Sequence, residues 1–167
     1  MTPTVPWFAL IVKPRYEKAV VQGLRYKNIE EFLPMSFTWR RWSDRMKLLE
    51  LPLFPGYVFC RCDYENRLAV LDTPGVASFV SLGRGPAEVS NEEIGRIRAI
   101  AASGLPAESG PFVRIGQRVR IEDGPLAGLE GILDRNKASL RVVVNVELLQ
   151  RSVLVEVDRA IISALPA

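Results

Sequence analysis

Histidine is absent from this 167-residue sequence. Histidine is the commonest general base, the commonest metal ligand and the usual partner of a nucleophilic serine or cysteine. The remaining catalytic routes need clustered carboxylates or a lysine buried beside a pocket, and the sequence shows no such pattern. We therefore expect a protein that is not an enzyme and that uses no cofactor and no metal.

Cysteine is scarce, with two residues, Cys60 and Cys62. They lie two positions apart on one face of a predicted strand. This spacing disfavours a disulfide between them and supplies only half of a metal site. The pattern favours a pair of buried, reduced thiols.

Long apolar runs and a strong charge excess are also missing. No segment approaches the roughly 20 apolar residues of a membrane span, and the first residues lack the pattern of a signal peptide, so we expect a cytoplasmic protein. The net charge is +3, and residues 1–105 hold 14 basic and 11 acidic residues against 8 and 8 in residues 106–167. This asymmetry predicts modest contact with a polyanion by the first part of the chain.

Residues 53–59, Leu-Phe-Pro-Gly-Tyr-Val-Phe, combine three aromatic side chains with a Pro-Gly break. If a strand begins at Gly56, its period of two places Tyr57 and Phe59 on one face, and Val58 with both cysteines on the other. Both faces are then apolar. Such a strand is either buried on both sides or presents one side as a binding surface.

The hydrophobic periodicity predicts an α+β fold. We expect strands over residues 7–13, 29–42, 46–51, 56–62 and 76–82, with a hairpin tip at 43–45 and a loop at 83–86. We expect helices over residues 16–28 and 64–72, and a third helix after a capping box at 90–93. This order describes helices packed against an antiparallel sheet in a first domain, residues 1–101.

The rest of the chain has a different pattern. Residues 102–111 are small, contain Gly and Pro, and predict a flexible linker. Residues 112–167 hold alternating β-branched strands with few helical signals. We expect these strands to close into an SH3-like barrel, because closure removes the exposed edges of so small a sheet.

Residues 116–132, Gly-Gln-Arg-Val-Arg-Ile-Glu-Asp-Gly-Pro-Leu-Ala-Gly-Leu-Glu-Gly-Ile, closely resemble the KOW motif of ribosome- and transcription-associated proteins. Together with Trp7-Phe8, residues 54–58, Thr-Pro-Gly-Val at 73–76 and Ser-Asn-Glu-Glu-Ile at 90–94, the sequence is similar to the NusG family of bacterial transcription elongation factors. The resemblance covers nearly the whole chain. It implies an N-terminal domain that binds the clamp helices of the largest RNA polymerase subunit, and a tethered KOW domain that recruits a further partner.

The resemblance also implies particular binding residues. The hydrophobic depression that binds the clamp helices matches, by position, Ile11, Phe54, Pro55, Tyr57, Phe59, Phe79 and Leu82, although Phe79 and Leu82 cannot share one face of a regular strand. Two basic groups match positions near DNA in the elongation complex: Lys13 and Arg15 near the non-template strand, and Arg40, Arg41, Arg45 and Lys47 in the hairpin near the upstream duplex. The solvated-surface interpretation of these basic residues stays open, because Lys and Arg are mostly exposed in any protein.

The KOW part departs from the family pattern at residues 148–151. Leu148, Leu149, Gln150 and Arg151 stand where family members usually carry Ile-Phe-Gly-Arg, the loop that binds Rho or a small-subunit ribosomal protein. We take Leu148, Leu149 and Arg151 as the candidate partner-binding residues. The departures favour a specialised branch that suppresses pausing and termination, like the RfaH-like and UpxY-like proteins. We expect a monomer, and the valine-rich strands favour a permanent barrel.

The alternative is a ribosome-associated or other RNA-binding KOW protein without polymerase contact. It explains the KOW string but gives no role to the apolar face of residues 54–59.

Overall fold

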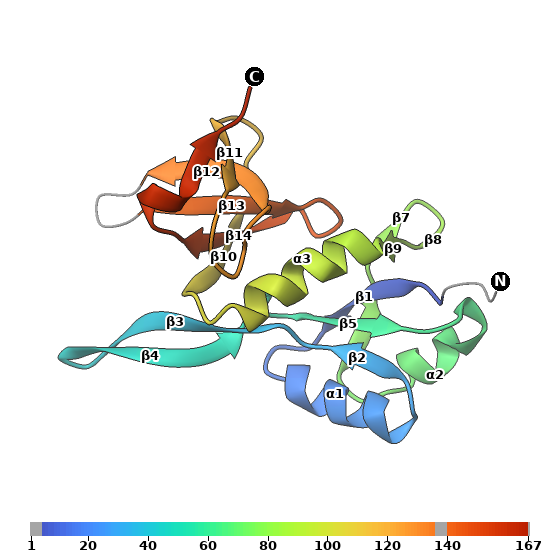
Figure 1. The fold of residues 1–167 in the computed structure, drawn as a ribbon. Coiled ribbons are helices and arrows are strands. Elements are labelled where there is room, and N and C mark those ends of the chain that lie inside the picture. Colours follow the sequence, from blue (N-terminus) through green and yellow to red (C-terminus); the bar gives the residue numbers. More distant parts are fainter. Residues whose placement is uncertain (1–4, 136–139, 167) are drawn as a thin grey trace. The chain divides into compact units, whose positions relative to one another are not determined.

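The computed structural model describes residues 5–135 and 140–166 (Figure 1). They divide into two compact units. Unit 1 comprises the described residues within 1–34 and 54–94, and unit 2 those within 35–53 and 95–167. Both are built on antiparallel sheets with few helices, which confirms the predicted α+β class.

The main sheet of unit 1 has five strands. They are β1 (Trp7–Val12), β2 (Glu30–Phe32), β5 (Tyr57–Arg61), β6 (Val76–Phe79) and β9 (Glu88–Val89). The order is β2-β5-β1-β6, and β9 also pairs with β1. All residues of β1 except Ile11 are buried, so side chains on both faces of this central strand are covered, which agrees with its apolar sequence.

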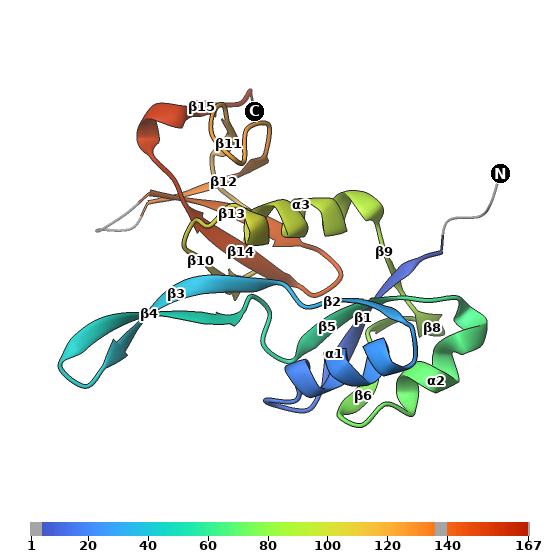
Figure 2. The same ribbon diagram turned by 60° about the horizontal axis from the view of Figure 1, so that its bottom comes forward.

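The core of unit 1 lies on one face of this sheet. Phe8, Leu10 and Val12 of β1 pack with Val58 and the two cysteines against α1 (Glu17–Tyr26) and α2 (Arg67–Leu71). The apolar residues of α1 recur at helical spacing and are buried, so burial of this stripe fixes the helix on the sheet. Figures 1 and 2 show both helices on the same side of the sheet.

The short helix expected over 64–72 is confirmed as the 3-10 turn η1 (Tyr64–Asn66) followed directly by α2. One segment of unit 1 differs from the sequence expectation. The strand expected over 76–82 is interrupted: β6 ends at Phe79, and β7 (Ser81–Leu82) pairs instead with β8 (Gly85–Pro86), within the expected loop. Gly83, whose φ is +69°, lies in the turn that joins β7 to β8.

The helix α3 (Asn91–Ala102) begins in unit 1 and continues in unit 2. The predicted capping residue is confirmed, because the Ser90 hydroxyl oxygen accepts a hydrogen bond from the Glu93 backbone N–H at 3.1 Å. Ile94, Ile97 and Ile100 are all buried, as their spacing predicts. Among the described residues, this helix and the others are too short or too polar to cross a membrane.

Unit 2 contains a two-stranded ribbon, β3 (Met35–Trp42) and β4 (Arg45–Pro52), paired in register from Met35 opposite Pro52 to Trp42 opposite Arg45. The predicted hairpin tip is confirmed, with Ser43 at a φ of +58°. Figure 2 shows the ribbon as a long, twisted pair of strands.

Unit 2 also contains a six-stranded antiparallel sheet. Its strands are β10 (Ala107–Pro111), β11 (Arg118–Ile121), β12 (Glu130–Arg135), β13 (Leu140–Val146), β14 (Arg151–Glu156) and β15 (Ile162–Ala164), in the order β10-β14-β13-β12-β11-β15, with the turn η2 (Arg159–Ile161) before β15. Val142, Val144, Val153 and Val155 alternate into its core. Closure into an SH3-like barrel stays a prediction.

Two features of this sheet bear on the sequence expectations. Residues 107–111 fall within the expected flexible linker, but they form β10 and pair with β14, because backbone groups of small residues can extend a sheet edge without any periodic pattern. In the KOW string, Gly131 lies so close to β13 that an added Cβ would stand 2.5 Å from the Val143 carbonyl oxygen, which explains a glycine there.

Candidate protein- and nucleic-acid-binding surfaces

The Pro-Gly break of residues 54–57 forms a β-turn that begins β5. The Phe54 carbonyl accepts a hydrogen bond from the Tyr57 N–H at 3.1 Å, and Gly56 has a φ of +88°. Proline at the second and glycine at the third position are the residues that a type II turn requires. We call residues 54–57 the docking turn. Pro55 is exposed and Tyr57 is half-buried.

The second face of the unit 1 sheet carries the apolar residues opposite the helical core. Tyr57 and Phe59 lie on this face, because Tyr57 pairs with Ile11 and Phe59 with Ala9 across β1 and β5. The predicted division of β5 into two apolar faces is therefore confirmed. Ile11 is 40% exposed and stands beside Tyr57.

Phe54 and Phe59 differ from the expectation of an exposed surface. They are 2% and 0% exposed. Their rings contact each other with centroids 6.2 Å apart, and Phe59 stacks on Phe32 at 6.0 Å. The sequence did not single out Phe32, which lies across from Phe59 only because β2 pairs with β5. These rings form a rigid base for the exposed residues of the face.

The sequence indicates that Phe79 and Leu82 cannot share one face of a regular strand, and in the structure they lie in different sheets. Phe79 is buried in the helical core, where its ring meets that of Phe8 at 5.5 Å in an edge-on arrangement. It pairs with Leu10 and so shares the core face of the sheet, whereas Tyr57 lies on the opposite face. Its role in polymerase binding stays a prediction. Leu82 is 71% exposed on β7, which belongs to a separate two-stranded sheet.

The β1–α1 loop holds the first pair of predicted DNA-binding residues. Lys13 and Arg15 are exposed, and Arg15 has a φ of +68°. The loop is fixed through its backbone, since the Lys13 N–H donates to the Gly75 carbonyl at 2.8 Å and the Val12 N–H to the Gly56 carbonyl at 2.9 Å. The second bond joins this loop directly to the docking turn.

The β3–β4 hairpin separates its four basic residues. The register pairs Arg40 with Lys47, and Trp42 with Arg45, so one face of the hairpin carries Trp42 and three of the basic residues. The fourth basic residue, Arg41, pairs with Met46 on the other face. The Lys47 ammonium lies 5.2 Å from the centre of the Trp42 ring. The sequence placed all four basic residues in one group, but only three of them share a face.

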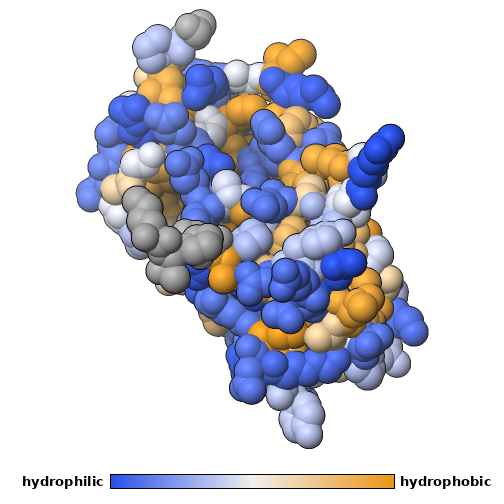
Figure 3. Space-filling view, turned by 90° about the vertical axis from the view of Figure 1, so that its right-hand side faces the viewer, coloured by the Kyte–Doolittle hydropathy of each residue, from blue (hydrophilic) through white to orange (hydrophobic). Residues whose placement is uncertain are grey.

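The opposite face of the hairpin is mostly apolar. It carries Phe37, Trp39, Met46 and Leu48, which are between 41% and 57% exposed. Figure 3 shows one side of the molecule, on which hydrophobic side chains gather in patches among hydrophilic ones. The hairpin is therefore a ribbon with one basic, aromatic face and one apolar face.

The turn at residues 147–150 and the first residue of β14 hold the predicted partner-binding residues of unit 2. Arg151 is exposed and Leu148 half-buried, but Leu149 is only 6% exposed and belongs to the core. Leu149 therefore differs from the expected contact residue. Gln150 has a φ of +51°, and both its backbone N–H and its Nε2 donate to the Glu147 carbonyl, at 3.1 and 2.7 Å.

The two cysteines are free and buried, as the sequence predicted. The pKa of the Cys60 thiol lies above its ordinary value, because it hydrogen-bonds to the Cys62 sulfur and is buried. A neutral, buried thiol is a packing group rather than a nucleophile.

Fold and surfaces together define an α+β protein with an aromatic turn at the start of β5, a hairpin with one basic face, and a second turn before β14. The family described as "Transcription termination factor nusG" matches residues 5–98. The chain belongs to the NusG family of transcription termination and antitermination proteins.

Individual relatives agree with this assignment. Transcription termination/antitermination protein NusG of Deinococcus radiodurans is 32% identical over 64% of this chain and 65% of its own length, so this match spans just under two thirds of the relative. The protein of the same description from Pseudomonas aeruginosa is 27% identical over 91% of this chain and 94% of its own. A solved structure of Thermotoga maritima NusG, 20% identical, superposes with a TM-score of 0.57 over 96% of this chain and 97% of that one, which shows the shared fold.

Proposed function

We propose that this protein binds the clamp helices of the largest RNA polymerase subunit through the docking turn and Ile11, and so acts during transcript elongation. The observation that supports the proposal most directly is the docking turn itself. It places exposed Pro55 and half-buried Tyr57 beside exposed Ile11, on a base of packed aromatic rings. A rigid aromatic residue in the middle of an apolar patch is a common centre of binding energy.

The experiment is a comparison of Tyr57→Ala with Tyr26→Ala in binding to core RNA polymerase. Tyr26 is 90% exposed at the end of α1, so it controls for the loss of an exposed ring elsewhere. We expect Tyr57→Ala to weaken binding by about 2 kcal/mol or more, roughly thirtyfold, and Tyr26→Ala to leave it unchanged. Equal binding by the two folded variants would contradict the proposal.

We also propose that the basic residues contact DNA of the elongation complex. Lys13 and Arg15 are placed next to the docking turn by the Val12–Gly56 hydrogen bond, so a polymerase bound at the turn would bring them near nucleic acid. Arg40, Arg45 and Lys47 share the hairpin face that carries Trp42. Phosphate contacts release counterions, with a log-log salt slope of about 0.9 per contact on duplex DNA.

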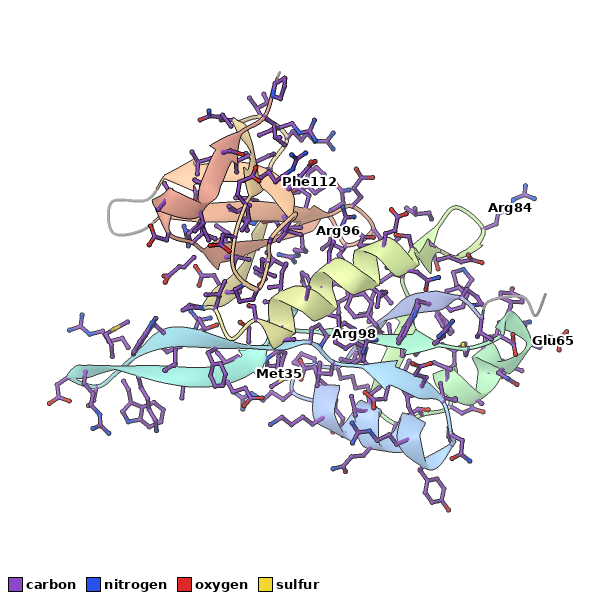
Figure 4. The ribbon with its side chains drawn as sticks, in the orientation of Figure 1. Met35, Glu65, Arg84, Arg96, Arg98 and Phe112 are labelled. Carbon is purple, nitrogen blue, oxygen red and sulfur yellow. The ribbon has the colours of Figure 1, made fainter. Side chains whose placement is uncertain are left out.

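The hairpin offers a test with two internal controls. We expect the triple variant R40A/R45A/K47A to reduce the salt slope of DNA binding by up to about 3, and R41A, on the other face, to reduce it less. Arg84 lies in the β7–β8 turn, and its side chain extends outward from that turn (Figure 4), so R84A should have no effect. Equal slopes for R84A and the triple variant would show that the hairpin does not contact DNA.

For unit 2 we propose that Leu148 and Arg151 contact a second partner, either Rho or a small-subunit ribosomal protein. The departure at Gln150 from the family's glycine supports a specialised role in antitermination. A single-round transcription assay with a pause site and a Rho-dependent terminator distinguishes the roles: read-through supports antitermination, and increased termination contradicts it. Co-purification with ribosomes but not polymerase would favour the RNA-binding alternative. Because the proposed partner acts in the bacterial cytoplasm, we propose the same location for this protein, as a monomer.

A further inference from the structure

A buried acidic residue, Glu17, lies directly behind the docking turn. It is the first residue of α1 and is 7% exposed. One of its carboxylate oxygens accepts a hydrogen bond from the Gly56 backbone N–H at 3.0 Å. Acidic side chains are rarely buried unless they are paired, so this contact needs a reason.

The geometry of the turn supplies one. In a type II turn, the N–H of the third residue lies outside the hydrogen bond that closes the turn, and here the closing bond runs from Tyr57 to Phe54. The Gly56 N–H therefore needs another acceptor, and Glu17 is that acceptor. The Gly56 carbonyl in turn accepts from the Val12 N–H. Both polar backbone groups of Gly56 are thus held by residues at the two ends of the β1–α1 loop.

We infer that Glu17 is a positioning residue for polymerase binding: it holds the central peptide of the docking turn in the orientation that presents Pro55 and Tyr57. This inference rests on the proposed function of the turn. An incorrectly oriented turn would have to be reordered on binding, and ordering costs reduce affinity.

The same hydrogen bond connects the two proposed contact regions. Glu17 follows the loop that carries Lys13 and Arg15, and its side chain bonds the turn that carries Tyr57. Loss of this bond would leave only the Val12–Gly56 hydrogen bond to hold Gly56 to this loop, and so loosen the relation between the two groups of residues, although Glu17 itself is buried from both partners.

A different role for Glu17 is to stabilise α1, because an acidic residue in the first turn interacts favourably with the helix dipole. Glutamine separates the two roles. Glu17→Gln keeps an oxygen that accepts from Gly56 but removes the charge, whereas Glu17→Ala removes both. If the dipole is what matters, the two variants behave alike.

The test compares E17A, E17Q, Y57A and V21A in the full chain. Val21 is a core residue of α1 that packs toward the sheet, so V21A controls for lost stability at the same helix. We expect E17A to weaken polymerase binding about tenfold, E17Q to stay within about twofold of the unaltered protein, and V21A to retain binding. Amide hydrogen exchange at Gly56 should accelerate in E17A and stay slow in E17Q.

The outcomes are separable. If Y57A weakens binding but E17A does not, the inference about Glu17 is wrong and the docking turn stands. If Y57A has no effect, the proposed function fails, and Gly56 exchange alone decides whether Glu17 holds the turn. Unchanged Gly56 exchange in E17A overturns the inference in either case.

Discussion

The docking turn in unit 1 and the turn at residues 147–150 in unit 2 both contain a residue with a positive φ, but different hydrogen bonds hold the two turns in place. Each contains a residue in the left-handed region, Gly56 with a φ of +88° and Gln150 with a φ of +51°. Glycine adopts this region without steric strain, and Gly56 is held from outside by Glu17 and Val12. Gln150 incurs the strain and bonds locally to Glu147 instead. The comparison teaches that the first turn is fixed by its surroundings and the second largely by itself.

The largest effect that tests this comparison is expected at Leu149. The resemblance predicts that Leu149 contacts a partner, but its side chain is buried. We expect Leu149→Ala to lower the free energy of unfolding by about 2 to 5 kcal/mol, as buried leucines do. Urea denaturation of the full chain, with the half-buried Leu148→Ala as control, measures this. A stable L149A variant that lost only partner binding would restore the contact role.

Gly56→Ala is expected to have the next largest effect. An added Cβ meets no atom within 4 Å, so the cost is strain alone. A left-handed conformation costs an ordinary residue about 1 to 2 kcal/mol, and alanine recovers a part of this in the unfolded chain. We expect a net loss of about 1 kcal/mol in the free energy of unfolding.

Gly95→Ala is the matched control, since Gly95 lies inside α3 with equally open space and without a positive φ. It should stabilise by about 0.5 to 1 kcal/mol. If both variants shift stability in the same direction, the conformation of Gly56 is not the cause.

The reverse change in the second turn should have a smaller and opposite effect. Gln150→Gly relieves about 1 to 2 kcal/mol of strain but loses about 0.5 to 1 kcal/mol to the greater freedom of the unfolded chain, and it also removes the Nε2 bond to Glu147. We expect a net stabilisation of about 0.5 kcal/mol. Gln150→Ala, which keeps the strain and loses the bond, should destabilise, and thermal unfolding of the pair checks the sign.

The smallest effect concerns exposed charges of the C-terminal sheet, in contrast to buried Glu17. A hydrogen bond from Arg120 lowers the pKa of Glu130 below its ordinary value near 4.5, and Arg118 adds to this. A carboxylate with a lowered pKa stabilises the fold above its unfolded pKa, and this contribution is lost as the pH falls through the folded pKa. The free energy of unfolding, measured between pH 3 and pH 6, should therefore fall less steeply with decreasing pH in Glu130→Gln than in the unaltered protein. An identical pH profile would show that the ion pairs contribute nothing.

Much of the local structure could be predicted from the sequence. The division of β5 into two apolar faces, the cap at Ser90 and the two buried thiols all depend on residues close together in the chain. The site residues were predicted less well. A family resemblance gives the place of Phe79 in the sequence but not the face of the sheet on which its side chain lies. The pairing of Phe79 with Leu10 decides that face.

By itself the sequence determined the α+β class, the Pro-Gly turn with its aromatic neighbours, and membership of the NusG family through residues 5–98. Only the tertiary structure decided which of those aromatic residues are exposed, which hairpin face holds Arg41, and that Glu17 bonds Gly56. The physical reason is the separation, along the chain, between the residues that interact. Periodicity and turn chemistry act between neighbours, whereas burial and hydrogen bonds such as that from Gly56 to Glu17 join residues far apart in the chain.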